Sequence, residues 1–224
     1  MRYASNPEPK YSATALEIAA IESAVVHTFR HVIWCPDSSN AHPDEAFWSL
    51  ADRILNNSHG NRNAVIISKG VVLGIPLSLQ KLLIQLAYHF RHPAGMDQTK
   101  WSLLMAEVAF WESTLWKDGI ADVCDKPKGC DNNKLERAYQ DANLLCILAA
   151  SFLFCCCHTG VSQAGQLYQG SSHPSFAHLW QVKKALEILR DAKKNDEWVG
   201  CYFGSWALLF LGYAVERDED IELI

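Results

Sequence analysis

The chain has 224 residues, of which 49% are hydrophobic and 20% are charged, a composition typical of a globular domain and not of a disordered segment. Its 20 Lys and Arg against 25 Asp and Glu give a net charge of −5, which argues against direct nucleic-acid binding by this segment alone. Residues 1–12 are expected to be a flexible lead-in without the apolar core of a secretory signal, so the eight cysteines are expected to be reduced.

Residues 13–224 are predicted to form a single helical domain, because apolar residues recur at three- and four-residue spacing along most of that length. The first helix is expected to run from about Ala13 to Trp34, just before Pro36. The second is expected to begin near Pro43, with acids in its first turn, and to end at the turn cluster 56–61. Its predicted inner residues are Phe47, Leu50, Ala51 and Ile54.

The short apolar stretch 64–67 is compatible with either a strand or a helix, whereas the next two helices are clearly indicated. The third follows Pro76, and the fourth is expected to be capped by Asp97. The inner residues predicted for the third are Leu79, Leu82, Leu83, Leu86 and Phe90. Those predicted for the fourth are Trp101, Leu104, Met105, Val108, Trp111 and Leu115.

Asn133 followed by Glu136 has the spacing of a capping box, which predicts the start of a fifth helix that reaches Cys157 and is buried over most of its length. A sixth helix is expected after a cap at Ser175, and a seventh over 198–215, before the acidic first turn of another at 218–220. The residues expected inside the sixth are Phe176, Leu179, Leu186 and Leu189. The predicted architecture is all-α, an irregular bundle of about six to eight helices.

Two uncharged stretches raise the question of membrane insertion. The stretch 144–157 is shorter than the roughly 20 residues that span a bilayer. The stretch 198–215 is closer to that length, but three glycines interrupt it. Buried core helices are therefore favoured for both, and no membrane contact is expected.

The histidine and cysteine clusters are candidate metal sites by residue type. His27 and His31 share one helix face, but Thr28 stands where a zinc hydrolase needs Glu, so surface histidines are favoured. Residues 155–157 are three consecutive cysteines, which point about 100° apart on a helix and so do not converge on one ion. They are better explained as small apolar side chains. Cys124 and Cys130 lack a second metal-binding pair and are expected to be exposed thiols, with redox sensitivity as the alternative.

No catalytic constellation or cofactor motif stands out, so the chain is not expected to be an enzyme or to hold a cofactor or metal. The stretch 200–205 lacks the order of a nucleophile elbow. Acidic pairs such as Asp44 with Glu45, and the acids of 218–222, sit at helix starts and suit capping. The tryptophans either fill the core or line a pocket for a small apolar ligand, and both interpretations stay open. They are Trp48, Trp101, Trp111, Trp116, Trp180, Trp198 and Trp206.

Two segments resemble the regulatory domain of fungal zinc-cluster transcription factors. The first, 71–84, has that family's apolar-Gly-apolar-Pro entry to a helix. The second, 206–214, resembles its Trp-x-Leu-Phe-x-x-Gly helix. The motif residues, expected to be structural, are Gly74, Pro76, Leu79, Trp206, Phe210 and Gly212. The physical expectation is that glycine permits a sharp entry, proline presets the first helical turn and the leucines dock.

In that family the helical region follows a zinc-binding module with six cysteines and regulates activity through contacts. This chain has no cysteine before Cys35 and stops soon after Trp206, so we expect a fragment or a regulator that works without its own DNA-binding module. The resemblance implies a nuclear or otherwise cytoplasmic protein that regulates transcription of a biosynthetic gene cluster through protein partners or self-association. The alternative is a small helical enzyme or binding protein for an apolar metabolite.

Overall fold

The computed structural model is all-α, as predicted: the residues that it describes form helices and no strand. The described residues are 13–34, 44–58, 74–92, 97–118, 132–158, 176, 178–192, 205–212, 214–215 and 217–222. The lead-in 1–12, the stretch 64–67 and most of the predicted loops lie outside them.

Side-chain caps fix the starts of the first two helices. Before α1 (Ala15–Trp34), the Glu17 N–H donates to Thr14 Oγ1 at 3.2 Å, and the Thr14 N–H donates to the Glu17 carboxylate at 2.8 Å. This capping box was missed in the sequence, although its Thr-x-x-Glu pattern is readable there. Asp44 caps α2 (Glu45–Ser58) by accepting from the Phe47 N–H at 2.8 Å. The helix therefore starts after Pro43 and includes Ser58, which was assigned to a turn.

The entry to α3 (Leu77–Arg91) confirms the role expected of its glycine and corrects that of its proline. Gly74 has φ 63°, a left-handed conformation that other residues adopt only at a cost. Pro76 was expected inside the first helical turn, but it is the N-cap residue, with φ −57° and ψ 139°. Its carbonyl accepts the first helical hydrogen bond, from the Gln80 N–H at 3.0 Å.

The next two helices begin close to the predicted positions. Asp97 caps α4 (Gln98–Asp118), as expected, by accepting from the Lys100 N–H at 2.7 Å. The fifth helix, α5 (Asn132–His158), includes Asn133, so the cap predicted at that residue is wrong by at least one position. The side chains of 132–136 lie outside those described.

The C-terminal part of the chain is only partly described. The sixth helix, α6 (Trp180–Ala192), begins later than predicted, and the cap expected at Ser175 lies outside the described residues. Within the predicted stretch 198–215, residues 198–204 are likewise undescribed, and α8 (Ser205–Gly212) ends before Val215.

The acidic segment at the C-terminal end forms the expected helical turn, α9 (Asp218–Ile221). Its Asp220 carboxylate is almost fully buried and accepts hydrogen bonds from Arg190 of α6 at 2.6 Å and from Arg217 at 2.7 Å. Charge-assisted bonds of this kind are stronger than neutral ones, so they hold the last turn on α6.

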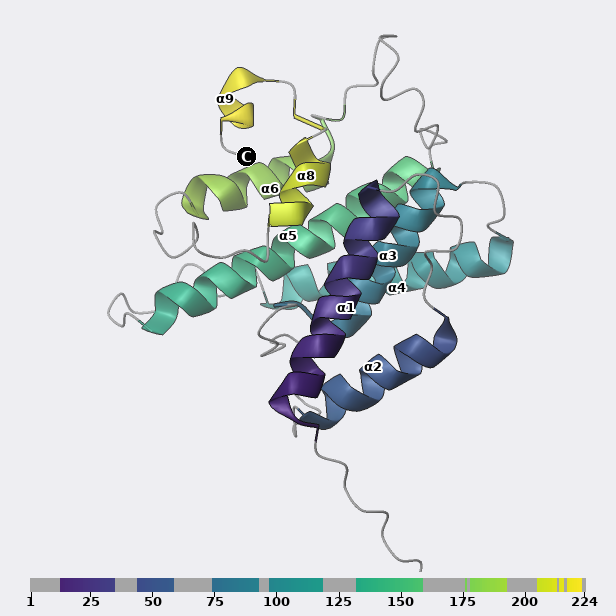
Figure 1. Ribbon diagram of the computed structural model, residues 1–224. Helices are drawn as coiled ribbons and strands as arrows, with labels where there is room; N and C mark the ends of the chain where they lie inside the picture. The colour runs from purple at the N-terminus through teal and green to yellow at the C-terminus, as the bar shows by residue number, and fades with distance from the viewer. Residues whose placement is uncertain are drawn as a thin grey trace, which may run out of the picture.

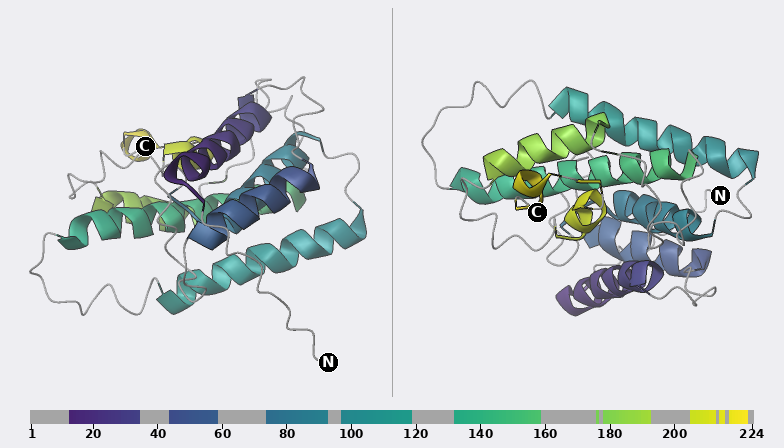
Figure 2. Two further views of the ribbon diagram at one scale, coloured as in Figure 1. Left: turned by 60° about the horizontal axis from the view of Figure 1, so that its bottom comes forward. Right: turned by 90° about the horizontal axis from the view of Figure 1, so that it is seen from above.

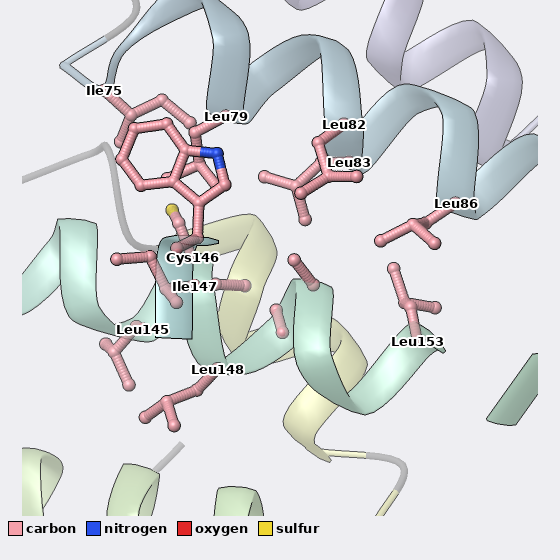
Figure 3. Close-up of a cluster of buried hydrophobic side chains, with 14 of the residues drawn as sticks. Ile75, Leu79, Leu82, Leu83, Leu86, Leu145, Cys146, Ile147, Leu148 and Leu153 are labelled. Carbon is pink, nitrogen blue, oxygen red and sulfur yellow. The ribbon is translucent and has the colours of Figure 1, made fainter. Parts of the chain in front are cut away.

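The long helix α5 is the centre of the fold, with α3, α4, α6 and α8 packed against it (Figure 1). The α1 helix packs on α3 and α2, on the side opposite to α4 (Figure 2). Leu82, Leu83 and Leu86 of α3 are fully buried and point toward α5 (Figure 3). Each such side chain stabilises the fold by about 1.5–3 kcal/mol.

One stretch of α5, Arg137–Cys157, is long and apolar enough to cross a membrane by length and composition. The same test is passed by the core helix of a globular fold, and 67% of the apolar window is buried inside this structure. Its position among four other helices explains the apolar composition without a membrane.

Two inner residues predicted from periodicity are wrong. Leu50 of α2 is 37% exposed and Met105 of α4 is 51% exposed. On α2 the buried positions are Trp48, Ala51, Ile54 and Leu55. On α2 the buried stripe is rotated from the predicted one, whereas on α4 it consists of predicted residues and is narrower than predicted.

Candidate interaction surface

The α4 helix has an inner apolar face that packs on α5 and α3. Four of the six predicted inner residues are buried there: Leu104, Val108, Trp111 and Leu115. Trp101 is half-buried and stacks on Phe154 of α5, with ring centroids 4.3 Å apart and planes 13° apart. The inner face thus accounts for one side of the helix.

The opposite side of α4 is apolar as well, although it faces solvent. Over residues 102–110 every exposed side chain is uncharged. We call this set the outer face of α4: Ser102, Leu103, Met105, Ala106, Ala109 and Phe110. Leu103 is 66% exposed and Phe110 is 52% exposed. An exposed helix normally carries charged residues on this side, and a helix that is apolar all round is normally covered.

The one charged residue within that stretch, Glu107, borders the outer face, because it follows Leu103 by four residues and precedes Phe110 by three. Glu107 is half-buried, and burial raises the pKa of its carboxyl, an effect that Lys81 of α3 opposes. Lys81 also lies 3.6 Å from a Glu45 carboxylate oxygen and 5.5 Å from the Trp48 ring centroid, both in α2. The outer face as defined contains no charged residue, and the half-buried Glu107 lies at its edge.

A polar network on the inner side fixes α4 to the core. Gln181 of α6 donates to the Ser151 hydroxyl of α5 at 2.9 Å, and that hydroxyl donates to Glu112 of α4 at 2.5 Å. Ser151 and Gln181 are buried, where hydrogen bonds of this kind specify one arrangement of the helices. The outer face is thus presented by a helix held in one orientation.

A second ionisable group, Asp141 of α5, is partly buried near α6. Burial raises the pKa of Asp141 to about 6, an effect that Arg137 opposes and Asp191 of α6 reinforces. The charged form is disfavoured because little water reaches it. A folded-state pKa raised in this way makes the stability of the fold depend on pH.

The six motif residues lie at two separate places on the core. Gly74 and Leu79 are buried at the start of α3, and Pro76 caps that helix. Trp206, Phe210 and Gly212 belong to α8, which packs on α5; the side chains of Trp206 and Phe210 lie outside those described. The described motif residues therefore lie at the start of α3 and in α8, and the structure does not bring these two groups together.

The predicted metal candidates stay apart. His27 and His31 are exposed on α1, and among the described residues no group of three metal-binding side chains comes together. Burial raises the pKa of Cys156 and of Cys157 to about 12, and the Cys157 thiol donates to the Leu86 carbonyl at 3.9 Å. These thiols stay protonated at neutral pH, which disfavours both metal binding and nucleophilic attack. Cys124 and Cys130 lie outside the described residues.

The tryptophans described by the structure have different environments. Trp48 and Trp111 belong to the main hydrophobic core, whereas Trp180 is 40% exposed on α6. Trp116, Trp198 and Trp206 have no described side chain. The two core tryptophans fill space between helices, which was the commoner of the two interpretations.

Comparison of the chain with protein families, with curated proteins and with solved structures gave no match.

Proposed function

We propose that this chain is a helical regulatory domain of the kind found in fungal transcription factors, and that it acts by protein contact and not by chemistry. In this proposal it works in the nucleus on a biosynthetic gene cluster, and a partner supplies the DNA-binding module. The observation that carries the proposal is the outer face of α4, a rigidly held apolar surface of the type that marks protein-interaction sites.

The motif geometry gives independent support. The left-handed Gly74 and the N-cap position of Pro76 make the sharp entry to α3 that an apolar-Gly-apolar-Pro segment requires, which supports the proposal. The net charge of −5 also favours a partner that is a protein over a phosphate backbone.

A tethered reporter assay tests the proposal. The full chain is fused to an unrelated DNA-binding module in a fungal cell, and transcription from a promoter carrying that module's site is measured. We expect the wild-type chain to change reporter output several-fold. The variant Phe110→Glu should remove most of that change, whereas Leu16→Glu, at an 80% exposed position on α1, should preserve it.

Equal reporter output from the wild-type fusion and from the DNA-binding module alone would refute a regulatory role. Saturable binding of an apolar metabolite with a change in tryptophan fluorescence would instead support the alternative, a metabolite-binding protein.

A further inference from the structure

A small apolar cluster between α5 and α6 is separate from the main hydrophobic core. We call it the second cluster, and its buried members are Phe152, Cys156, Val182, Leu186 and Ala214. The main core contains another thiol of the same helix, Cys146. A satellite cluster of this kind can lose its cover while the main core keeps its own packing.

The C-terminal end of the chain supplies part of the cover of the second cluster. We call the described residues 214–215 and 217–222 the C-terminal strap. Ala214 is 1% exposed within the cluster, and Val215 packs against it. The strap ends in α9, which lies beside α6 (Figure 1). The second cluster is therefore closed on one side by residues that follow α8.

The last turn of the strap is attached to α6 by charge. The Asp220 side chain is 5% exposed and accepts from Arg190 at 2.6 Å and from Arg217 at 2.7 Å. Arg217 belongs to the strap itself, so the bond from Arg190 is the one that joins the strap to α6. Ile221, the apolar residue of α9, is 53% exposed and adds little burial.

This attachment is weaker than the packing of the core. The Arg190 side chain is 48% exposed, so water and salt reach its guanidinium and screen the ion pair. Segments with few buried apolar contacts open at a lower free-energy cost than the whole fold. The strap is thus expected to open while α3 and α5 stay packed.

We propose that the C-terminal strap is a gate over the Cys156 thiol, closed while Asp220 binds Arg190 and open when that bond breaks. In the closed state burial is the main cause that raises the pKa of Cys156 to about 12, and Cys155 and Cys157 add to it. Opening lets water reach the thiol and removes the main cause, so more of the reactive thiolate forms. The gate does not depend on what the outer face of α4 binds.

Pulse labelling of the folded full chain with N-ethylmaleimide tests the gate. Fragment masses from tandem mass spectrometry locate each modified thiol. In the wild type, Cys156 should react about tenfold faster than Cys146 or more, because the strap opens without the main core. At about 1 M NaCl, where the Debye length is about 3 Å, the Cys156 rate should rise severalfold.

Two arginine variants provide the matched comparison. Arg190→Gln removes the bond between α6 and the strap, so it should accelerate labelling of Cys156 severalfold and leave the Cys146 rate unchanged. Arg217→Gln removes a guanidinium from the same carboxylate but keeps the bond from Arg190, so its effect on Cys156 should be clearly smaller. An unchanged Cys156 rate in R190Q, or equal acceleration of Cys156 and Cys146, would overturn the gate.

A variant distant from the strap separates local opening from unfolding of the whole chain. Gly74→Ala strains the entry to α3 and lowers the stability of the whole fold. It should therefore accelerate labelling of Cys146 and leave the faster Cys156 rate nearly unchanged. A Cys156 rate that rises in step with that of Cys146 would show that only global unfolding exposes the thiol, which would also overturn the gate.

Discussion

Asp141 of α5 allows the account of the core to be tested by a single substitution, Asp141→Asn. Its folded-state pKa of about 6 is above its ordinary value of 3.8, so the folded chain holds the proton more tightly than the unfolded chain. The sign follows from this difference: the group favours folding while it is protonated, and that contribution is lost as the pH rises from about 4 to about 6. Above that window the fold carries a partly buried carboxylate.

The magnitude follows from the size of the shift. A difference of about 2 pKa units corresponds to roughly 3 kcal/mol at full effect. Because the side chain is only partly buried, solvent screening reduces this figure, and we expect about 1–2 kcal/mol. Asparagine has nearly the same shape without the charge. The D141N variant should therefore be more stable than the wild type at pH 7.5, by an amount that falls to roughly half at pH 5.

Urea unfolding, followed by circular dichroism at pH 5.0, 6.0 and 7.5, measures this difference. The control is Glu187→Gln on α6, which removes an exposed carboxylate whose Lys184 pair lies on the surface. Its stability change should stay below about 0.5 kcal/mol at every pH. A D141N variant that is no more stable at pH 7.5, or whose advantage is the same at all three pH values, would refute the argument from burial.

Three further predictions concern the entry to α3, the last helical turn and the buried thiols. Gly74→Ala should lower the free energy of unfolding by about 1–2 kcal/mol, because alanine is disfavoured at φ 63°, whereas Ser78→Ala at a nearby exposed position should change it little in the same urea titration. Asp220→Asn weakens the two charge-assisted hydrogen bonds from Arg190 and Arg217, so amide hydrogen exchange in α9 should accelerate at least severalfold, with little effect on exchange in α3. Equal α9 exchange rates in the wild type and the variant would show that these bonds do not hold α9 in place. Cys156 and Cys157 should react with a thiol reagent at neutral pH only as fast as the fold opens, and labelling within seconds under native conditions would show that they are accessible thiolates.

Local signals in the sequence predicted most of the helices. Asp97 and Asp44 mark helix starts because a short carboxylate side chain can accept a hydrogen bond from the free backbone N–H groups there. Gly74 before Pro76 predicted a sharp entry, and the left-handed glycine confirms it. Thr14 and Glu17 carried the same kind of signal and were overlooked.

The outer face of α4 could not be assigned from periodicity alone. Leu104 and Leu103 are both apolar, and so are Met105 and Phe110, so the pattern does not tell which side another helix covers. The pattern consequently predicted that Met105 faces the core, whereas it is exposed. The covered side is decided by contacts with α5, and those depend on the packing of the whole bundle.

The polar network and the buried carboxyl were not predictable for a related reason. Ser151 lies 39 residues from Glu112 and 30 residues from Gln181 in the chain, and the three side chains meet only when three helices pack. Asp141 reads as an ordinary helical acid until α6 covers it. Such long-range contacts leave no periodic or local trace in a single sequence.

We propose that the outer face of α4 is in contact with protein in the cell. Hydroxyl-radical footprinting of Phe110 tests it most directly, because this ring is 52% exposed in the isolated fold. We predict that Phe110 is oxidised severalfold more slowly in cells than in a dilute purified sample, while Trp180, 40% exposed on α6, is oxidised at a similar rate in both. Equal oxidation of Phe110 in cells and in dilute solution would contradict the account.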